Sequence, residues 1–392
     1  MDREQGLRYP PELLNLFRQH RHSRRDFVAR AAKLTVGALA AGSVFEALSA
    51  DSAFAQDPGA LAPGSVKRVA VIGAGHYHAT AAPGYLNILK NLHLEIVGVH
   101  DFDPALAKSR ADFAGSTPYT DYKLMCEQTK PDFVLSLCRH DMMSDPIRYL
   151  INAGLPFMAE KPWGTDPTVV NELADLADKK KAWATFPASM RYSAWAQTCR
   201  EMYQKKELGN ISHMLVRFNN PGTQRYIDEG SAWMLSKKTA GGGCLVNLGI
   251  HGFDLCTYIT GEIPKVVAAS TSHNICNLEV EDYALVTLST PSGMIFVNEA
   301  SYTYPTNGSD SEHTISAKNF LVREAGNAAH VTGPGRNDSV TMPAGYVGSW
   351  PGAVADAVDR LSKGLPPAAT AQDNARAVQL TFDAYRMAGE KS

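Results

Sequence analysis

The sequence predicts an α/β fold in which a doubly wound parallel sheet is followed by a C-terminal α/β domain with an open, largely antiparallel sheet. Val69–Ile72 is a short apolar run that ends at Gly73, and this pattern predicts a buried strand. Apolar runs and amphipathic segments then alternate as far as residue 186, as is typical of a parallel sheet with helical crossovers. From residue 187 the predicted strands become longer and the helices between them fewer, which indicates a second domain.

The first 55 residues predict an export signal. Ser23–Val28 (SRRDFV) resembles a twin-arginine signal, Leu34–Phe45 is a mildly apolar segment, and Ala53–Ala55 offers a small-x-small cleavage site. The apolar segment is too short for a stable membrane anchor. We therefore expect a signal peptide over residues 1–55 and a linker over 56–65. The twin-arginine export machinery would then deliver a periplasmic or secreted protein; the alternative is an amphipathic cytosolic helix with a chance arginine pair.

The composition limits the classes of partner that we expect for the chain. Its 392 residues are 44% hydrophobic and 20% charged, with a formal net charge of −2. A charge so close to zero argues against nucleic acid or an anionic membrane surface as a partner. The six cysteines include no Cys-x-x-Cys pair, so we expect buried apolar side chains and assign no metal site. A disulfide formed after export stays an open alternative.

The predicted first domain spans residues 66–186. Its further strands are expected at Leu94–His100, Asp132–Leu137 and Phe157–Ala159. Its helices are expected at Pro104–Phe113, Asp145–Ala153 and Pro167–Lys180.

The turn after the first strand has the features of a dinucleotide site. Gly73 and Gly75 let the backbone approach a pyrophosphate, which would meet free N–H groups and the positive end of the following helix. The third glycine position of this fingerprint holds His78, so the match is partial. Asp101 ends the second strand, where a carboxylate accepts both ribose hydroxyls and repels a 2′-phosphate; NAD is thus favoured over NADP. The alternative for Asp101 is a helix cap or turn.

The predicted second domain spans residues 187–392. Its strands are expected at Ile211–Asn219, Lys265–Ser272, Tyr283–Ser289 and Met294–Tyr302, with a hairpin turn at Pro291–Gly293 before the last. Its last two helices are expected at Ala353–Leu361 and Ala375–Met387.

Three motifs occur in order: Gly73-Ala74-Gly75, Glu160-Lys161-Pro162, and Gly241–Asp254 (GGGCLVNLGIHGFD). Together they resemble the motifs of the Gfo/Idh/MocA oxidoreductases, over nearly the whole chain from Val66 to Lys391. The resemblance implies a Rossmann domain that binds a nicotinamide cofactor, and a C-terminal domain whose open sheet supports a homo-oligomer. Because the twin-arginine route carries folded proteins, we expect the cofactor to be tightly bound.

The resemblance also implies catalytic roles. Lys161 would hydrogen-bond the reacting oxygen and stabilise its developing negative charge. His251 would be the general base, since an ordinary imidazole pKa of about 6.5 suits proton transfer at neutral pH. Asn247, one helical turn earlier, would orient the substrate or the imidazole. The alternatives are a solvated surface lysine for Lys161 and a structural histidine for His251.

The remaining candidate residues are assigned to the cofactor and the substrate. The cofactor contacts are expected from Gly73, Ala74, Gly75, His76, Tyr77, His78, Asp101, Glu160 and Lys161. The substrate contacts are expected from Arg191, Tyr192 and Trp233, with packing between domains as the alternative for each.

These patterns favour an exported NAD(P)-dependent oxidoreductase that transfers hydride between a nicotinamide and a carbohydrate-like substrate: a sugar, a polyol or a related hydroxylated compound. One alternative is an NAD-dependent glycoside hydrolase of the same superfamily, although its histidine segment generally differs from the one here. The other is a noncatalytic sugar-binding relative, because a fold does not guarantee chemistry.

Overall fold

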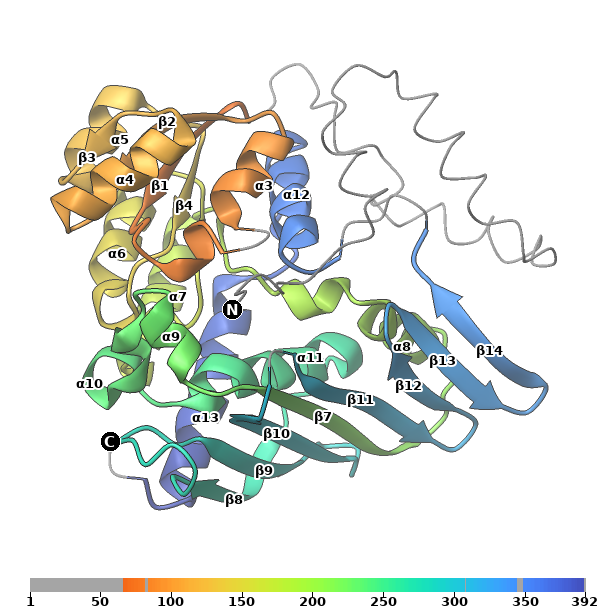
Figure 1. Ribbon diagram of the computed structural model, residues 1–392. Coiled ribbons are helices and arrows are strands. Elements are labelled where there is room, and N and C mark those ends of the chain that lie inside the picture. Colours follow the sequence, from red (N-terminus) through yellow and green to blue (C-terminus); the bar gives the residue numbers. More distant parts are fainter. Residues whose placement is uncertain (1–65, 82–83, 307, 344–347, 391–392) are drawn as a thin grey trace, which may run out of the picture. The chain divides into compact units, whose positions relative to one another are not determined.

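A six-stranded parallel sheet, sheet A, forms the first half of the fold (Figure 1). The computed structural model describes residues 66–81, 84–306, 308–343 and 348–390, so the predicted signal peptide and linker lie outside the described residues. The strands are β1 (Arg68–Ile72), β2 (Glu95–His100), β3 (Pro118–Tyr119), β4 (Phe133–Ser136), β5 (Phe157–Ala159) and β6 (Ala184–Thr185). Their order is β3-β2-β1-β4-β5-β6, so the winding reverses between β1 and β4. Open α/β sheets bind ligands at the carboxyl ends of the strands beside such a reversal.

The helices of this half are α3 (Tyr85–Asn91), α4 (Pro104–Ala114), α5 (Tyr122–Thr129), α6 (Ser144–Ala153) and α7 (Pro167–Lys180). Asp103, Asp121 and Asp166 cap α4, α5 and α7 by accepting hydrogen bonds from backbone N–H groups. The sequence predicts a helix after the glycine turn, and α3 is that helix, but it does not begin at the turn itself. The chain instead forms a 3₁₀ turn, η1 (Tyr77–Ala79), and α3 begins only after Gly84.

An eight-stranded sheet, sheet B, forms the second half and is largely antiparallel, as predicted. Its strands are β7 (Ile211–Pro221), β8 (Lys265–Ser272), β9 (Tyr283–Ser289), β10 (Ile295–Tyr304), β11 (Asp310–Ala317), β12 (Leu321–Ala325), β13 (Ala328–Gly333) and β14 (Arg336–Thr341). The order is β14-β13-β12-β11-β7-β10-β9-β8. Among the described strands of this sheet, β7 and β10 form the only parallel pair. The sequence predicts β7 to β10 but not β11 to β14.

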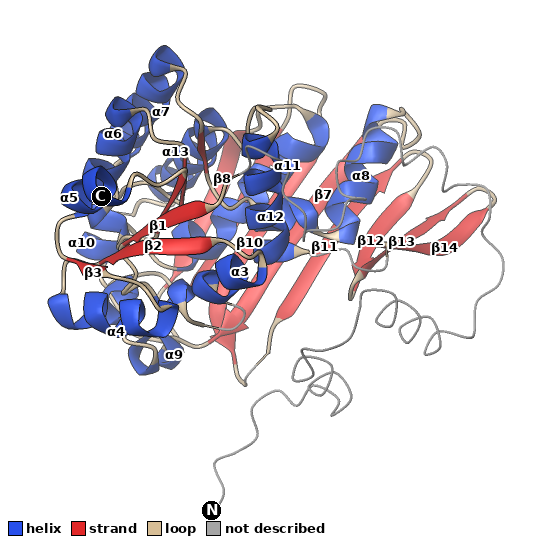
Figure 2. Cartoon of the chain, turned by 90° about the horizontal axis from the view of Figure 1, so that it is seen from above, coloured by secondary structure: helices blue, strands red, loops and turns tan. Residues whose placement is uncertain are grey.

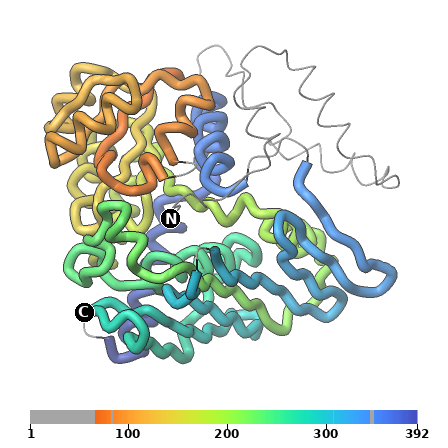
Figure 3. Tube along the Cα trace, in the orientation of Figure 1, coloured from red at the N-terminus to blue at the C-terminus, as the bar shows by residue number. Residues whose placement is uncertain are grey.

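The helical segments of this half are η3 (Ser189–Tyr192), α8 (Ala194–Gln204), α9 (Gln224–Asp228), η4 (Ala232–Leu235), α10 (Lys237–Ala240), η5 (Leu245–Gly249), α11 (Ile250–Thr260), α12 (Ser349–Ser362) and α13 (Ala371–Met387). Helices α8 and α11 pack on one face of sheet B (Figure 2). Helix α12 returns to lie beside α3 near the start of the described chain (Figure 3), and α13 packs against α7, α11 and β8. The C-terminal helices therefore join the two halves.

The core of the fold is apolar and lies between each sheet and its helices. Val69 to Ile72 of β1 are fully buried, as a central strand of a parallel sheet requires. All six cysteines are free, and five of them are buried. No helix among the described residues is long and apolar enough to cross a membrane.

Candidate active site

Lys161 lies at the carboxyl edge of sheet A, directly after β5, and reaches the second half of the fold. Its side chain is buried, and Nζ donates to the backbone carbonyl of Asn247 at 2.8 Å and to the Asn247 amide oxygen Oδ1 at 2.7 Å. The motif continues through a cis peptide bond to Pro162, whose carbonyl accepts a hydrogen bond from Asn374 of α13. The amine of the first half and the amide of the second half are thus brought into direct contact.

Asn247 lies in η5, a π-helical segment between the glycine-rich turn and α11. Such wide helical turns are uncommon and often occur at functional sites. The geometry is fixed by Glu281, whose buried carboxylate accepts hydrogen bonds from the N–H groups of Gly243 and Leu245. Gly243 is required there, because a Cβ atom at this position would lie 2.1 Å from the Glu281 carbonyl. Glu281 is therefore a structural residue that shapes the segment carrying Asn247.

A tyrosine and an arginine extend this contact. Asn247 Nδ2 donates to the hydroxyl of Tyr226 at 2.7 Å, and Arg225 Nη2 donates to the same hydroxyl at 2.7 Å. Tyr226 is fully buried in the short helix α9, whereas Arg225 is partly buried. The sequence analysis missed both residues, because a helix of five residues carries no periodic signal.

Glu160 supports Lys161 from the other side. Its carboxylate accepts hydrogen bonds from the hydroxyl of Tyr85 at 2.7 Å and the backbone N–H of Lys161, and it pairs with His78 Nδ1 at 2.8 Å. Burial by itself raises the pKa of this carboxyl, but His78 and Lys161 outweigh it and hold the pKa well below its usual value. His78, at the third glycine position, therefore anchors a carboxylate beneath the lysine.

The pKa values of Lys161 and His251 differ from their ordinary values in a way that the sequence does not reveal. Burial lowers the pKa of Lys161 to about 8, with Glu160 partly opposing the shift. Burial, reinforced by the Lys161 charge, lowers the pKa of His251 to about 3. The pKa of His251 thus lies below the ordinary imidazole value from which the sequence analysis argued. His251 is neutral at physiological pH.

His251 follows Asn247 at the start of α11 and keeps part of its surface accessible. It lies about one helical turn beyond Asn247, whose amide oxygen accepts from Lys161. The imidazole makes no hydrogen bond to another described residue; its ring neighbour is Phe218, with centroids 6.3 Å apart. Its ring nitrogens are thus available to a ligand.

Aromatic and imidazole rings form a cluster at the glycine turn. His76 and Tyr77 stack with centroids 5.0 Å apart, and Trp233 lies 5.5 Å from His76 and 5.0 Å from His140. His140 is buried, and its Nδ1 pairs with the carbonyl of Ala240 at 2.8 Å. Trp233 therefore lies next to the cofactor turn, as a substrate or cofactor contact requires.

The glycine turn is as tight as a dinucleotide site requires, but its N–H groups are not free as the sequence analysis expects. Those of Ala74 and His76 donate to backbone carbonyls, and that of Gly75 donates to Asp101. Gly73 has φ +73°, and a Cβ atom there would lie 2.6 Å from the backbone of Cys138. Gly75 donates its N–H to Asp101 Oδ2 at 2.7 Å, and Asp101 Oδ1 accepts from the N–H of Asp103 at 2.9 Å. Asp101 thus closes the turn, while Asp103 caps α4. Each carboxylate oxygen keeps a lone pair that a ribose hydroxyl can use.

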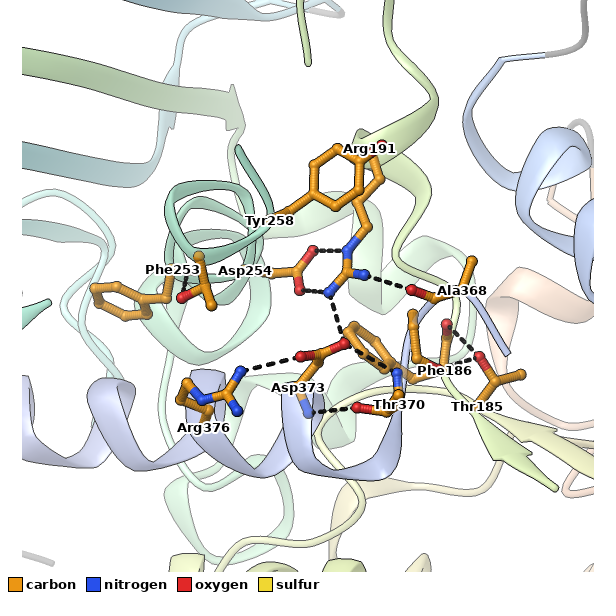
Figure 4. A network of polar contacts seen from close by, with 12 residues as sticks. Thr185, Phe186, Arg191, Phe253, Asp254, Tyr258, Ala368, Thr370, Asp373 and Arg376 are labelled. Atoms are coloured by element: carbon orange, nitrogen blue, oxygen red, sulfur yellow. Dashed lines mark hydrogen bonds and ion pairs between the residues drawn. The ribbon is translucent and has the colours of Figure 1, made fainter. Parts of the chain in front are cut away.

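Arg191 and Tyr192 have protein partners that account for their polar groups. Arg191 forms a two-pronged ion pair with Asp254, a further pair with Asp373 and a hydrogen bond to the carbonyl of Ala368 (Figure 4). The Tyr192 hydroxyl donates to Asp356 at 2.7 Å. These contacts favour the packing alternative for both residues, and Asp254 braces its helix through Arg191.

Comparisons with known proteins agree with this architecture. A family model described as an oxidoreductase family with an NAD-binding Rossmann fold matches residues 67–186, and a GFO/IDH/MocA C-terminal domain matches residues 196–317. A D-glucoside 3-dehydrogenase of Escherichia coli (strain K12) is 28% identical over 50% of this chain and 54% of its own length. The rhizopine catabolism protein MocA of Rhizobium meliloti is 26% identical over 52% of this chain and 61% of its own length. The chain therefore spans only part of the length of these relatives.

Solved structures share the fold across both halves. An inositol dehydrogenase homolog from Azotobacter vinelandii, complexed with NAD⁺, has a TM-score of 0.73 at 16% identity, covering 86% of this chain and 98% of its own. An aldose-aldose oxidoreductase from Caulobacter crescentus has a TM-score of 0.69 at 20% identity, covering 83% and 98%. The two family models together cover more than half of the sequence. The chain belongs to the GFO/IDH/MocA family of oxidoreductases and contains the NAD-binding Rossmann domain of that family.

Proposed function

We propose that this protein is an NAD-dependent oxidoreductase that oxidises a hydroxyl group of a sugar, a polyol or a related compound, or reduces the matching carbonyl. One observation carries the proposal: the buried amine of Lys161, from the NAD-binding half, donates to the amide of Asn247 in the other half. His251, about one helical turn after Asn247, makes no hydrogen bond to a described residue. NAD⁺, when bound, accepts a hydride from the carbinol carbon. The name of the D-glucoside 3-dehydrogenase relative supports a sugar-like substrate.

Lys161 holds and moves the hydroxyl proton in this proposal. A pKa of about 8 lets the neutral amine accept that proton near neutral pH, and lets the ammonium form return it in the reverse reaction. The ammonium also stabilises negative charge on the reacting oxygen. For a substrate oxygen to reach Nζ, it takes the place of one of the two Asn247 oxygens that accept from Nζ now.

His251 positions the substrate. With a pKa of about 3 the imidazole stays neutral, so it offers one N–H donor and one acceptor to a sugar hydroxyl. Asn247 and Tyr226 hold Lys161 in place, and Glu160 sets its charge. In this proposal Lys161, rather than His251, is the general base.

NAD is proposed as the physiological cofactor, because the Asp101 carboxylate at the end of β2 disfavours a 2′-phosphate. NADP is the alternative. Tight binding and delivery by the twin-arginine machinery to the periplasm or the exterior are further parts of the proposal, supported by the Arg24-Arg25 pattern of the N-terminal segment. The last part of the proposal is that the protein forms a homo-oligomer through sheet B.

The test begins with the purified full chain. Mass spectrometry of the small molecule released on denaturation is expected to find NAD. Incubation with NAD⁺ and a panel of sugars and polyols is expected to produce NADH, and Lys161→Met is expected to abolish it. Release of nitrophenol from nitrophenyl glycosides without net NADH would instead support the glycoside hydrolase. A protein that binds no nucleotide in titration would support a noncatalytic relative.

A further inference from the structure

Arg225 is a cation without a counter-charge at the edge of the candidate site. Among the described residues, its one hydrogen-bond partner is the Tyr226 hydroxyl, and its guanidinium also lies over the Tyr226 ring, 4.6 Å from the centroid. Arg225 forms no ion pair within the part of the chain that the structure describes; Glu229, one turn further along, is exposed to solvent and does not pair with it. An arginine held in one place by a single neutral partner is unusual, because a partly buried charge normally finds an opposite charge.

Most of the donors of this guanidinium are unused. Its Nε atom is buried and has no hydrogen-bond partner among the described residues. A guanidinium has two edges, each with two parallel N–H groups that can bind a carboxylate. Nη2 contributes one N–H to each edge, and Tyr226 accepts only one of these two. One complete two-donor edge therefore remains, and this is the edge that a carboxylate binds in a parallel, two-pronged arrangement.

The position of Arg225 links this edge to the reacting centre. Its hydrogen bond to Tyr226, the bond from Asn247 to Tyr226 and the bond from Lys161 to Asn247 are each 2.7 Å long and form one continuous chain. On the cofactor side, burial raises the pKa of Tyr77 and lowers that of His78; the Arg225 charge partly opposes the first shift and adds slightly to the second. Only the Tyr226 hydroxyl and the Asn247 amide separate the two cations along this chain of hydrogen bonds, so a monosaccharide is the ligand size that we test.

We propose that Arg225 binds a carboxylate of the substrate, so that the protein prefers a sugar acid, such as a hexuronate, to the neutral sugar. The inference rests on the proposed oxidoreductase function and narrows its substrate class. One unpaired guanidinium matches the single charge of a carboxylate. A phosphate dianion would need a second cation, and the nearby Lys161 is held on Asn247 for the reacting oxygen.

The test compares matched ligands: D-glucose with D-glucuronate, and D-galactose with D-galacturonate, with D-glucose 6-phosphate as a further anion. Binding is measured as the ligand-induced rise in melting temperature in the presence of NAD⁺, and turnover as NADH formation. In the unmodified protein we expect at least one uronate to bind and to exceed its parent sugar by about 10- to 100-fold in affinity. Equal affinity for each pair, no binding of any uronate, or preference for the phosphate would overturn the proposal.

Variants separate this role from a structural one. Arg225→Met is expected to lower the affinity for the uronate much more than the affinity for the neutral sugar, and Arg225→Lys is expected to retain part of the preference. NAD⁺ titration of each variant checks that it is folded. Lys238→Met, which removes an exposed positive charge from the nearby helix α10, serves as the matched control and is expected to keep the full preference. Equal losses for the acid and the neutral sugar in Arg225→Met and Arg225→Lys would mean that Arg225 is structural.

The binding measurement distinguishes failure of the carboxylate site from failure of the proposed oxidoreductase function. If no compound yields NADH but a uronate still raises the melting temperature in an Arg225-dependent way, the carboxylate site stands and the oxidoreductase assignment fails. If neutral sugars yield NADH as well as the uronates do, the oxidoreductase assignment stands and the carboxylate site fails.

Discussion

Two buried cations in this protein lie in opposite environments. Arg191 is enclosed by Asp254, Asp373 and the Ala368 carbonyl, and the rings of Phe186 and Tyr258 lie against it (Figure 4). Lys161 follows Glu160 in the chain, but within the described residues its amine donates only to the neutral oxygens of Asn247.

Burial therefore does not separate structural from functional cations in this protein; what separates them is whether carboxylates and carbonyls occupy all of the cation's donors. A cation whose donors are all satisfied by carboxylates and carbonyls has no reason to bind a ligand, and removing it strands buried charges. A cation held by exchangeable neutral partners can transfer its hydrogen bonds to a substrate. The first group stabilises the fold, and the second is available for chemistry.

Replacing Lys161 is expected to have the largest effect on activity. Lys161→Met removes the amine that accepts the proton and stabilises the reacting oxygen, so we expect kcat/KM to fall by about 10³-fold or more. Circular dichroism and NAD⁺ titration are expected to match the unmodified protein. Lys179→Met, at an exposed lysine of α7, serves as the control. Retention of a tenth or more of the activity would place the proton transfer elsewhere.

Replacing Arg191 is expected to show the opposite pattern. Arg191→Met leaves Asp254 and Asp373 without their partner, so the free energy of unfolding is expected to fall by about 3–5 kcal/mol in denaturant titrations. The kcat/KM per folded molecule is expected to stay within about threefold, because Arg191 contacts no group of the site. Arg191→Met combined with Asp254→Leu is expected to recover part of the stability. A stable variant that has lost substrate affinity would return Arg191 to the substrate site.

Tyr226 offers a smaller change within the functional group. Tyr226→Phe removes the hydroxyl that accepts from Asn247 and Arg225, and the loss of one such bond is worth about tenfold. We expect this decrease in kcat at saturating substrate, measured by NADH formation. Tyr203→Phe, at a partly exposed tyrosine of α8, is the matched control. An unchanged kcat would show that the tyrosine does not help to hold Lys161.

Replacing Glu160 is expected to have the smallest effect, because the substitution changes the pKa of Lys161 and leaves its amine in place. The Glu160 carboxylate favours the ammonium form of Lys161, so Glu160→Gln lowers the lysine pKa below its present value of about 8. The neutral amine then forms at lower pH. The rise of kcat/KM for alcohol oxidation, centred near pH 8 in the unmodified protein, is therefore expected to shift to lower pH. A shift to higher pH would contradict the assignment of this titration to Lys161.

The elements that the sequence predicts well are those encoded locally. The apolar run of β1, the aspartate caps of α4 and α7 and the glycine that ends α6 are all visible over a few residues. Strand β14 (RNDSVT) has only one apolar residue, and pairing with β13 rather than its own pattern makes it a strand. Such strands depend on neighbours that a local pattern does not contain.

The same distinction applies to the site. The motifs identify Lys161 and Asn247, and the structure brings them together. Tyr226 and Arg225 are missed because their position depends on the path of the chain after β7. The pKa of His251 is unpredictable for a related reason, since burial and the nearby lysine charge are tertiary properties. Arg191 shows the reverse error: its residue type suggests a ligand contact, but its carboxylate partners come from other parts of the chain.

A crystal structure of the protein with NAD⁺ and a bound substrate or inert substrate analogue tests the central claim most directly. We expect the reacting oxygen to lie about 2.7–3.2 Å from Lys161 Nζ, replacing an Asn247 oxygen, with His251 hydrogen-bonded to the same ligand. A ligand bound elsewhere, with Lys161 still donating both hydrogen bonds to Asn247, would contradict it.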